Sequence, residues 1–538
     1  MMFSSKKADV DERVVATSAS SVDDDADLAA MGYKSEFKRE FTNLGTISFA
    51  FSIMGLCSSI STTFDTPMLL GGPASVVWCW AMGFCGCFFI GTSIAELVSA
   101  YPTSGGLYSA SCYLVPYRYR GPVGYVVGWM NLLGQVAGVA STEFGLSRMI
   151  WAAVNVRYDG AYEVTDGKLV GLFVGLLCIH GLLNSIPTKY LAGITQSFVF
   201  INLGATFAII IALLVCTDTK NSASYTFGEV YNQTGWSNNG ISFLFGLLSV
   251  QWVMTDYDAA AHISEEVRRA SIAAPVAIFV AVIGTGTIGW LFNIILVLCS
   301  VPIEDLPGPS GMSVPTILST RIGKGGFYAL WVFVCFTAFA VVQTAMQANA
   351  RTFFAFSRDG GLPDRGLFAK LAPNKIPLWG VWIVVLISVV MGLLQFASAV
   401  AVNAIFSLCA CSLDISYMIP VACKLFLRDH PEVNYKPGPF NPGRKLGAVC
   451  NVIAITWTCF AVVILIMPTL RPVTALNMNY ASVITVGVMM LAGLWYAVSA
   501  RKYYDGPRKT LPEKGSPSKS DEELDLDEVN DSKERGSP

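Results

Sequence analysis

The sequence predicts an all-α integral membrane protein with twelve transmembrane helices. Of the 538 residues, 53% are hydrophobic and only 14% are charged, and the mean hydropathy is +0.53. Soluble domains carry about 25% charged residues, so most of this exterior is expected to face lipid. The net charge of −2 and the lack of a basic domain argue against nucleic acid as a partner.

Twelve stretches are long enough to span a bilayer, which requires about 20 apolar residues in a helix. The run from Trp379 to Lys424 has no charge before Asp414, and its length fits two spans with a turn near residues 398–403. The expected spans are 45–69, 74–98, 122–153, 168–187, 190–216, 241–266, 273–300, 326–355, 378–399, 400–425, 447–467 and 477–500.

The distribution of Lys and Arg predicts the orientation, because these residues are enriched in cytoplasmic loops. An even number of spans places both termini on one side, and the loops on that side hold most of the loop Lys and Arg residues. Both termini are therefore predicted to be cytoplasmic. Residues 1–44 and 501–538 are expected to be disordered tails, the second of them acidic. The sequon at Asn232 then lies outside, as a candidate glycosylation site.

The first and sixth spans are both predicted to be interrupted. Five hydroxyl residues at 58–63 compete for backbone groups in the first span. Residues 255–258 place two carboxylates in the sixth, which is costly unless they face protein, water or a ligand. Transporters built from inverted repeats bind substrate at such paired interruptions. We therefore predict a substrate site formed by Ser58, Ser59, Ser61, Thr62, Thr255, Asp256, Tyr257 and Asp258.

Each part of this site also has a plainer interpretation. Hydroxyl residues are common where membrane helices pack. Asp258 is the first choice as partner of an ammonium group and Asp256 the second; alternatively, a neighbouring helix neutralises the carboxylate or it stays protonated. Trp252 and Tyr257 are suited to close over a bound amine by cation–π contact, or else they pack between helices.

The charged residues after the sixth span predict a cytoplasmic gate. Glu265 and Glu266 are expected to pair with Arg268 or Arg269, and Arg358 at the end of the eighth span to form the facing part. The alternative for the Arg358 region is a solvated turn.

Glu143 is the candidate for proton coupling. It lies about 20 residues into the third span, toward the outer half of the membrane. An ion pair with Arg148, five residues further on, is the favoured alternative.

Three phrases of the sequence resemble a known family. They are 96–108, which ends in Pro-Thr-Ser-Gly-Gly-Leu-Tyr, 262–267 after the sixth span, and 355–363 at the end of the eighth. Their combination resembles the amino acid–polyamine–organocation (APC) superfamily, in particular the fungal amino acid/choline permeases that include GABA and choline transporters. The resemblance covers roughly residues 40–500.

The resemblance implies a LeuT-type fold, with a 5+5 inverted repeat at about 45–216 and 241–425 and two further helices within about 447–500. It also implies import across a fungal plasma or vacuolar membrane. In such relatives the substrate carboxylate binds backbone amides at the first interruption, and its amine binds carbonyls at both. Relatives commonly have glycine where this chain has Asp256, so the aspartate points to a cationic group on the substrate.

These observations predict a secondary active transporter. It would import a small amine-bearing solute, an amino acid such as GABA, by alternating access coupled to protons. A choline or polyamine permease is the nearest alternative, and a transport-like nutrient receptor is a more distant one because both tails are short. The three histidines lack metal-ligand spacing and no nucleophile–base set is recognisable, so we expect neither an enzyme nor a metal or cofactor.

Overall fold

The computed structural model describes residues 25, 28–29, 31–34, 36–397, 399–475 and 477–508. Phe37–Gly506 forms one compact unit, which contains the helices from Asn43 to Lys502. Most of the two predicted tails, 1–44 and 501–538, lies outside the described residues. Within the unit, Phe37 and Tyr504 are both buried, so packed structure extends beyond the predicted boundaries at 44 and 501.

The unit is helical, and the described residues contain no strand. Eleven stretches among them are long and apolar enough to cross a membrane. They are α2–α4 (Asn43–Gly71), α5 (Pro73–Ala100), η1 with α7 (Tyr117–Arg157), α8 (Asp166–Asn184), α9 (Thr188–Cys216), α14 (Ala270–Leu298), α15 (Ser313–Arg358), α16 with η4 (Leu378–Phe396), most of α17 (Ala399–Leu427), α18 (Arg444–Ile466) and α19 (Ala481–Val498).

The predicted sixth span is divided into three short helices. These are α11 (Asn239–Leu244), α12 (Leu247–Val253) and α13 (Ala259–His262). The all-α membrane fold is therefore confirmed, with eleven candidate spans and one divided segment where twelve spans were predicted. The division between the ninth and tenth spans lies between η4 (Leu393–Phe396) and the start of α17 at Ala399, so α17 begins within the turn predicted near 398–403; Ser398 lies outside the described residues.

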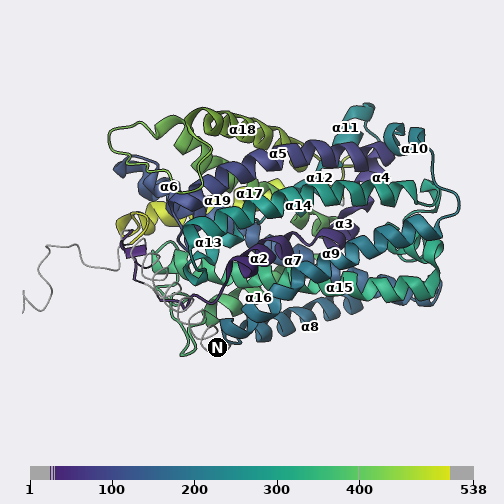
Figure 1. Cartoon of the computed structure of the whole chain (residues 1–538), viewed down its shortest axis with the longest axis horizontal. Coiled ribbons are helices and arrows are strands. Elements are labelled where there is room, and N and C mark those ends of the chain that lie inside the picture. Colours follow the sequence, from purple (N-terminus) through teal and green to yellow (C-terminus); the bar gives the residue numbers. More distant parts are fainter. Residues whose placement is uncertain are drawn as a thin grey trace, which may run out of the picture. The chain divides into compact units, whose positions relative to one another are not determined.

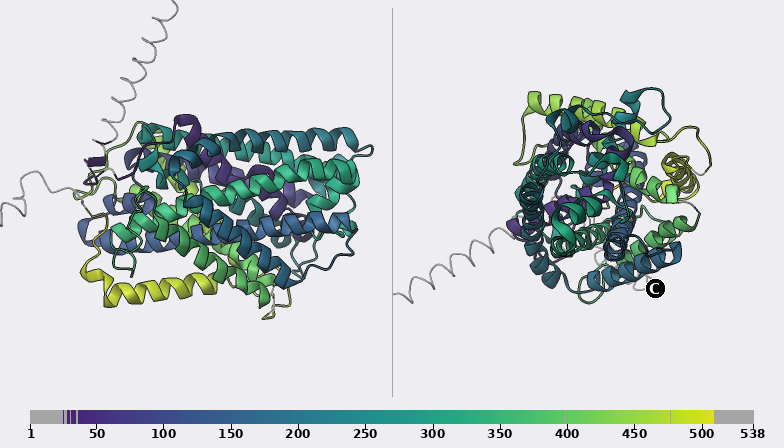
Figure 2. Two further views of the ribbon diagram at one scale, coloured as in Figure 1. Left: turned by 90° about the horizontal axis from the view of Figure 1, so that it is seen from below. Right: turned by 90° about the vertical axis from the view of Figure 1, so that its right-hand side faces the viewer.

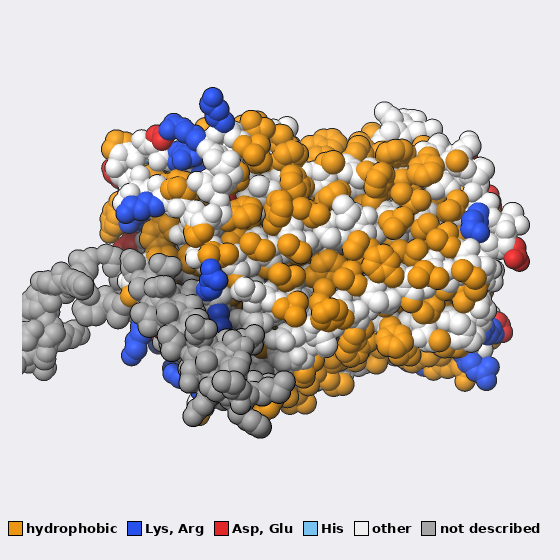
Figure 3. Space-filling view, viewed as in Figure 1, with side chains coloured by type: hydrophobic (Ala, Val, Ile, Leu, Met, Phe, Trp, Pro, Cys, Tyr) orange, Lys and Arg blue, Asp and Glu red, His pale blue; other side chains and the backbone are white. Residues whose placement is uncertain are grey.

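The long helices run side by side and leave two ends (Figure 1). The short helix α6 (Gly106–Tyr113) lies at one end, while α10 (Ala223–Gly228) and α11 lie at the other. We call these the α6 end and the α11 end. A view from a second side shows the same alignment of helices (Figure 2). Hydrophobic side chains cover the middle of the face in Figure 3, and charged side chains gather at its ends, as expected of a lipid-facing surface between two aqueous layers.

The first span is interrupted at Gly55, between α2 (Asn43–Met54) and α3 (Leu56–Thr63). Gly55 has a φ of 55°, a left-handed conformation that favours glycine. A Cβ atom at this position would lie 2.6 Å from Ser59 Oγ and would collide with Val341 of α15. Glycine is therefore required both by the turn and by the close approach of α15.

The hydroxyl cluster of the first span lies inside α3 and not at the break, which corrects the sequence-based expectation. The hydroxyls of Ser58, Ser61, Thr62 and Thr63 donate to backbone carbonyls three or four residues earlier, at 2.7–3.1 Å. These bonds satisfy the hydroxyls while the helix continues.

The sixth segment is interrupted over residues 254–258, between α12 and α13. Asp256 has a φ of 57°, which costs a residue with a Cβ atom about 1–2 kcal/mol. This left-handed backbone accounts for the glycine expected at this position in related permeases. The two interrupted segments touch, since the hydroxyls of Thr63 and Ser249 are 2.7 Å apart.

Candidate functional site

The two interruptions border a small internal space, which we call the central pocket. Its volume is about 20 Å³, enough for about one water molecule. A substrate therefore needs the surrounding helices to move apart. The pocket is lined by Ile53, Met54, Ser59, Gly138, Thr142, Trp252, Val253, Thr255, Asp256, Val341, Ala345 and Cys409.

Asp256 is the acidic residue of this lining. It is 6% exposed, and its Oδ1 atom has no hydrogen-bond partner among the described residues. Its backbone N–H donates to the hydroxyl of Tyr417 at 3.1 Å. A buried carboxylate oxygen without a donor is unfavourable, so a cationic donor placed in the pocket would relieve that cost.

Asp258 lies outside the lining of the central pocket and is fully buried. Its carboxylate accepts hydrogen bonds from Asn131 Nδ2 at 2.8 Å and from the Tyr417 hydroxyl at 2.6 Å. The Nε2 atom of His262 lies 3.3 Å from the same group. Asp256, the second choice of the prediction, therefore lines the pocket, whereas Asp258, the first choice, lies outside that lining and is hydrogen-bonded to neighbouring helices.

His262 connects this network to the turn before α6. Its Nδ1 atom lies 3.0 Å from the carbonyl oxygen of Ser104. Gly106 has a φ of 53°, and a Cβ atom there would lie 2.8 Å from His262 Cε1. The segments 96–108 and 262–267, which both carry the family resemblance, are thus in direct contact.

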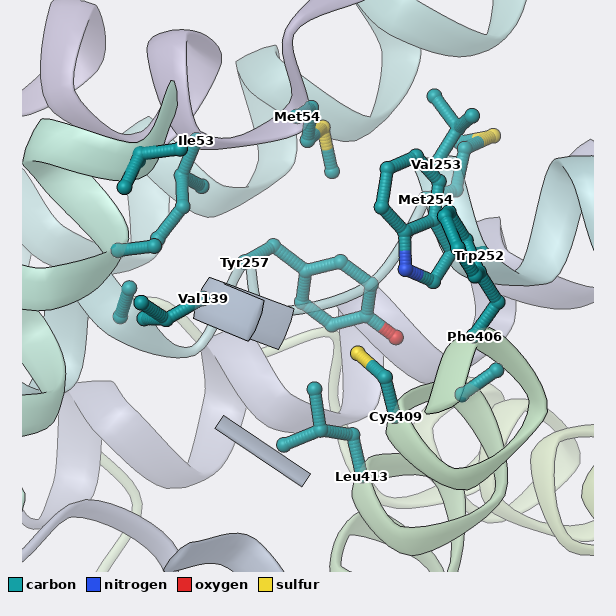
Figure 4. Packing of buried hydrophobic residues seen from close by; sticks show 14 of the residues in the cluster. Ile53, Met54, Val139, Trp252, Val253, Met254, Tyr257, Phe406, Cys409 and Leu413 are labelled. Carbon is teal, nitrogen blue, oxygen red and sulfur yellow. The ribbon is translucent and has the colours of Figure 1, made fainter. Parts of the chain in front are cut away.

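Trp252 and Tyr257 differ in their surroundings. Trp252 lines the central pocket, donates from Nε1 to Ser141 at 3.0 Å, and lies with its ring 4.9 Å from that of Phe406. Tyr257 is fully buried, with its ring 5.3 Å from that of Tyr417 and its hydroxyl without a partner among the described residues. Figure 4 shows Tyr257 within the apolar cluster. Trp252 is therefore placed for contact with a ligand, whereas Tyr257 packs.

A second and larger pocket opens toward the α11 end, and we call it the vestibule. Its volume is about 300 Å³, and Thr62, Leu248 and Phe406 are among its lining residues. The central pocket is lined by Ser59, Trp252 and Cys409, which lie on the same three helices as these vestibule residues. Each of them is three or four residues closer to the α6 end. One helical turn, about 5.4 Å, therefore separates the two spaces. The contact between Trp252 and Phe406 lies at this division.

The predicted substrate residues are thus distributed over several environments. Thr62 lines the vestibule, while Ser59, Thr255 and Asp256 line the central pocket. Those that line neither space are Ser58, Ser61, Tyr257 and Asp258.

Glu143 pairs with His180 of α8 and not with Arg148, contrary to the favoured interpretation. Glu143 Oε2 lies 2.8 Å from His180 Nδ1, and both side chains are fully buried. His180 Nε2 lies 3.1 Å from the carbonyl oxygen of Phe339. Because that oxygen can only accept, Nε2 carries a hydrogen, and a further proton is shared between Nδ1 and Oε2. Arg148 lines the vestibule and donates to the carbonyl of Gly311 at 3.3 Å.

Two buried ion pairs lie at the α6 end. Arg358 contacts Glu265 at 3.1 Å and Arg351 contacts Glu266 at 2.8 Å, and each of these side chains is at most 7% exposed. The backbone N–H of Ser104 donates to Glu265 at 3.1 Å. Arg358 thus contacts Glu265, while the role of these residues as a gate stays a prediction.

Arg268 is not the partner that the sequence predicted for the glutamates. Its Nε atom donates to the carbonyl of Arg39 at 3.2 Å, and its N–H donates to Phe41 at 3.2 Å. Phe41 in turn donates to the carbonyl of Glu266 at 3.0 Å. Residues 37–42, which we call the strap, therefore lie beside the gate and form one parallel bridge to Val267.

A buried cluster at the α6 end joins α5, α17 and the following loop. Lys424 Nζ bonds to Glu96, and the Tyr435 hydroxyl donates to the other oxygen of Glu96 at 2.9 Å. Burial, together with the Glu96 carboxylate, holds the pKa of Tyr435 above its ordinary value, so the hydroxyl stays a donor. No pairing among these residues was predicted, although a lysine and a glutamate in apolar spans are a signal for one.

Asn232 lies in the loop between α10 and α11, at the α11 end. Its Nδ2 atom donates to the carbonyl of Trp236 at 2.8 Å and to Asn239 Oδ1 at 3.0 Å. Glycosylation at this asparagine stays a prediction.

The described residues contain no group of three His, Cys, Asp or Glu side chains that would hold a metal ion. All 14 cysteines are free thiols, and Cys409 lines the central pocket.

Comparison with known proteins shows which family this chain belongs to. The sequence profile described as "Amino acid permease" matches residues 44–489. An uncharacterized amino-acid permease of Schizosaccharomyces pombe is 44% identical over 90% of this chain and 90% of its own. The GABA-specific permease of Saccharomyces cerevisiae is 32% identical over 92% of this chain and 87% of its own.

A solved structure shares the fold. The manganese transporter of Eremococcus coleocola superposes with a TM-score of 0.52 at 12% identity, covering 86% of this chain and 95% of that one. This likeness supports the predicted LeuT-type fold and carries no information on substrate. With the profile match over most of the chain, the conclusion is that the chain belongs to the amino acid permease family of the APC superfamily and is a multi-pass membrane transporter, not an enzyme.

Proposed function

We propose that this permease is a secondary active transporter that imports a small amine-bearing solute, with an amino acid such as GABA as the first candidate. The observation that carries the proposal is the buried Asp256 carboxylate, whose Oδ1 atom has no partner among the described residues. An ammonium group supplies both the charge and the donor that this oxygen lacks. The GABA-specific relative is consistent with such a substrate.

The substrate carboxylate is assigned to the start of α3. Met54 and Ser59 lie on either side of the break at Gly55, and both line the central pocket. The first N–H groups of a helix have no intrahelical acceptor, and they form the positive end of its dipole. Together with Asp256, this arrangement suits a zwitterion.

Choline and polyamines fit this pocket less well. Asp256 is its acidic residue and Trp252 its aromatic one. A polyamine requires several acidic groups, and choline prefers a cage of aromatic rings.

Alternating access follows from the two ends of the unit. If the termini are cytoplasmic, as the Lys and Arg distribution predicts, the α6 end faces the cytoplasm and the vestibule faces outward. Substrate then enters past Trp252 and leaves when the Glu265–Arg358 and Glu266–Arg351 pairs separate. A plasma or vacuolar membrane remains the proposed location.

Proton coupling is assigned to the Glu143–His180 pair. The pair shares one proton between Oε2 and Nδ1, 2.8 Å apart. Thr142, the neighbour of Glu143, lines the central pocket. Gain or loss of the shared proton therefore changes the charge close to the substrate.

Uptake of labelled GABA, choline and putrescine into yeast cells that lack their own permeases for these solutes tests the proposal. Accumulation of GABA that follows the pH gradient and not sodium would support it. Accumulation of choline or putrescine instead would reassign the substrate. Failure to accumulate any of the three, by a protein shown to reach the membrane, would contradict the proposal.

A further inference from the structure

A third pocket lies at the α6 end, apart from the central pocket and the vestibule. Its volume is about 270 Å³. Four segments line it, namely the strap, the start of α9, the loop before α16, and Glu266 of the short helix η2 (Ser264–Glu266). Because Lys38, Lys189 and Lys375 each come from a different one of these segments, we call it the lysine pocket.

The lysine pocket is suited to an anion. Its three lysines carry positive charge, and Glu40 is the neighbouring acid on the strap. The 29-residue helix α9 begins here, and its N-cap makes no side-chain capping bond. Thr188 and Lys189 of its first turn line the pocket, and N–H groups at a helix N-terminus favour phosphate. Helix dipole and lysines therefore act in the same direction.

Glu266 adds a second requirement for the ligand. It lines the lysine pocket, is 1% exposed, and pairs through Oε1 with Arg351. Its Oε2 atom has no partner among the described residues. A carboxylate oxygen accepts a hydrogen bond from a hydroxyl group but repels a phosphate. The pocket therefore suits a ligand that carries both phosphate and hydroxyl groups, such as a phosphorylated polyol.

The surface beside the pocket indicates a lipid as the source of that ligand. Tyr190 lines the pocket and is exposed, and Ile194 is exposed one turn further along α9. Ile186 and Trp379 are exposed apolar residues close to the pocket in sequence, before α9 and at the start of α16. Exposed aromatic side chains such as Tyr190 and Trp379 are typical of the interface between membrane and water. Acyl chains therefore have an apolar surface to follow away from the headgroup.

We propose that the lysine pocket binds the headgroup of an anionic inositol phospholipid from the leaflet at the α6 end. Its phosphate contacts the lysines and the start of α9, and an inositol hydroxyl contacts Glu266. Because Glu266 and the strap both border the gate, the bound lipid would hold the α6 end closed. This consequence rests on the proposed transport function, whereas binding itself does not.

Lipid retention by the purified full-length protein tests the binding. The protein is extracted from vesicles of equal phosphatidylinositol, phosphatidic acid and phosphatidylcholine, and the co-purified lipids are measured by mass spectrometry. We expect phosphatidylinositol to be enriched over both other lipids. The double variant Lys189→Gln/Lys375→Gln should lower that enrichment by up to about 30-fold, since each lysine near an anionic headgroup contributes roughly fivefold. Both lysines are exposed, so folding should be unaffected.

The matched control is Lys436→Gln/Lys445→Gln, which removes one exposed lysine from the loop after α17 and one from the first turn of α18. It should retain the wild-type enrichment. Equal retention of all three lipids, or an equal loss in both double variants, would overturn the proposal. Preference for phosphatidic acid over phosphatidylinositol would overturn the role given to Glu266. Saturable binding of inositol 1-phosphate without lipid enrichment would overturn the membrane as source.

The effect on transport is measured separately, by the rate of uptake in vesicles with and without phosphatidylinositol. We expect the lipid to slow wild-type turnover and to leave Lys189→Gln/Lys375→Gln unchanged. Selective lipid binding without an effect on the uptake rate would overturn only the inference that the bound lipid holds the α6 end closed. Loss of binding in a protein that still transports would overturn the site and leave the proposed function intact.

Discussion

Tyr417 donates a hydrogen bond of 2.6 Å to the carboxylate of Asp258. The same hydroxyl accepts the backbone N–H of Asp256 at 3.1 Å. Helix α17 therefore fixes the side chain of one aspartate and the backbone of the other. Asp256 can face the central pocket because its main chain, and not its carboxylate, takes part in this contact.

Tyr417→Phe should lower the free energy of unfolding by about 1–3 kcal/mol, because it leaves a buried carboxylate oxygen without its donor. Tyr257→Phe is the matched control: its hydroxyl is buried with no partner among the described residues, so its loss should be nearly neutral. Thermal unfolding of the purified proteins measures both. Equal effects of the two substitutions would contradict the assigned role of Tyr417.

Asp256→Gly should be more stable than Asp256→Ala by about 1 kcal/mol, because the φ of 57° is strained for a residue with a Cβ atom. Both variants lack the carboxylate, so both should lose uptake. The comparison thus separates the backbone effect from the chemistry of the side chain. An alanine variant as stable as the glycine variant would show that the break does not require this backbone conformation.

Arg351→Met should destabilise the protein by about 3–5 kcal/mol, because Glu266 would remain buried without its counter-charge. Adding Glu266→Gln should restore much of that loss. The exposed pair Lys324–Asp159 provides the comparison, and Lys324→Met should cost less than about 1 kcal/mol. Thermal unfolding gives all three values; a second substitution that brings no recovery would contradict a buried charge pair.

Glu143→Gln should abolish accumulation driven by a pH gradient and retain exchange of labelled for unlabelled amino acid across vesicles. The reason is that a glutamine cannot take up and release the proton now shared with His180. His180→Asn should behave in the same way. Parallel loss of exchange and accumulation would indicate a structural pair instead.

The membrane fold and the region of the site could be predicted from local sequence features. Apolar stretches of membrane length, and carboxylates at 256 and 258 within one of them, are visible in a single sequence. The charged residues of the proposed gate were also visible, since Glu265, Glu266 and Arg358 border the ends of spans. These features can be recognised within one segment, because the free-energy cost of placing a charged residue in lipid arises in that segment alone.

The pairings could not be predicted, because they depend on how distant helices pack. Asp258 binds Asn131, which is 127 residues away, and Glu143 binds His180 on another helix. The break in the first span was misplaced for a related reason. Whether a hydroxyl interrupts a helix or bonds within it depends on its surroundings. The need for Gly55 arises from its left-handed turn and from the approach of Val341 on α15.

The initial rate of labelled GABA uptake by Asp256→Asn tests the central claim most directly. Asp159→Asn, at an exposed ion pair on the α11 side, is the matched control for loss of one aspartate charge. With equal amounts of protein at the membrane, we predict that Asp256→Asn lowers the uptake rate by at least about 100-fold, because a buried charge-assisted bond to the substrate is lost. The Asp159→Asn control should retain the wild-type rate. Wild-type uptake by Asp256→Asn would contradict the account.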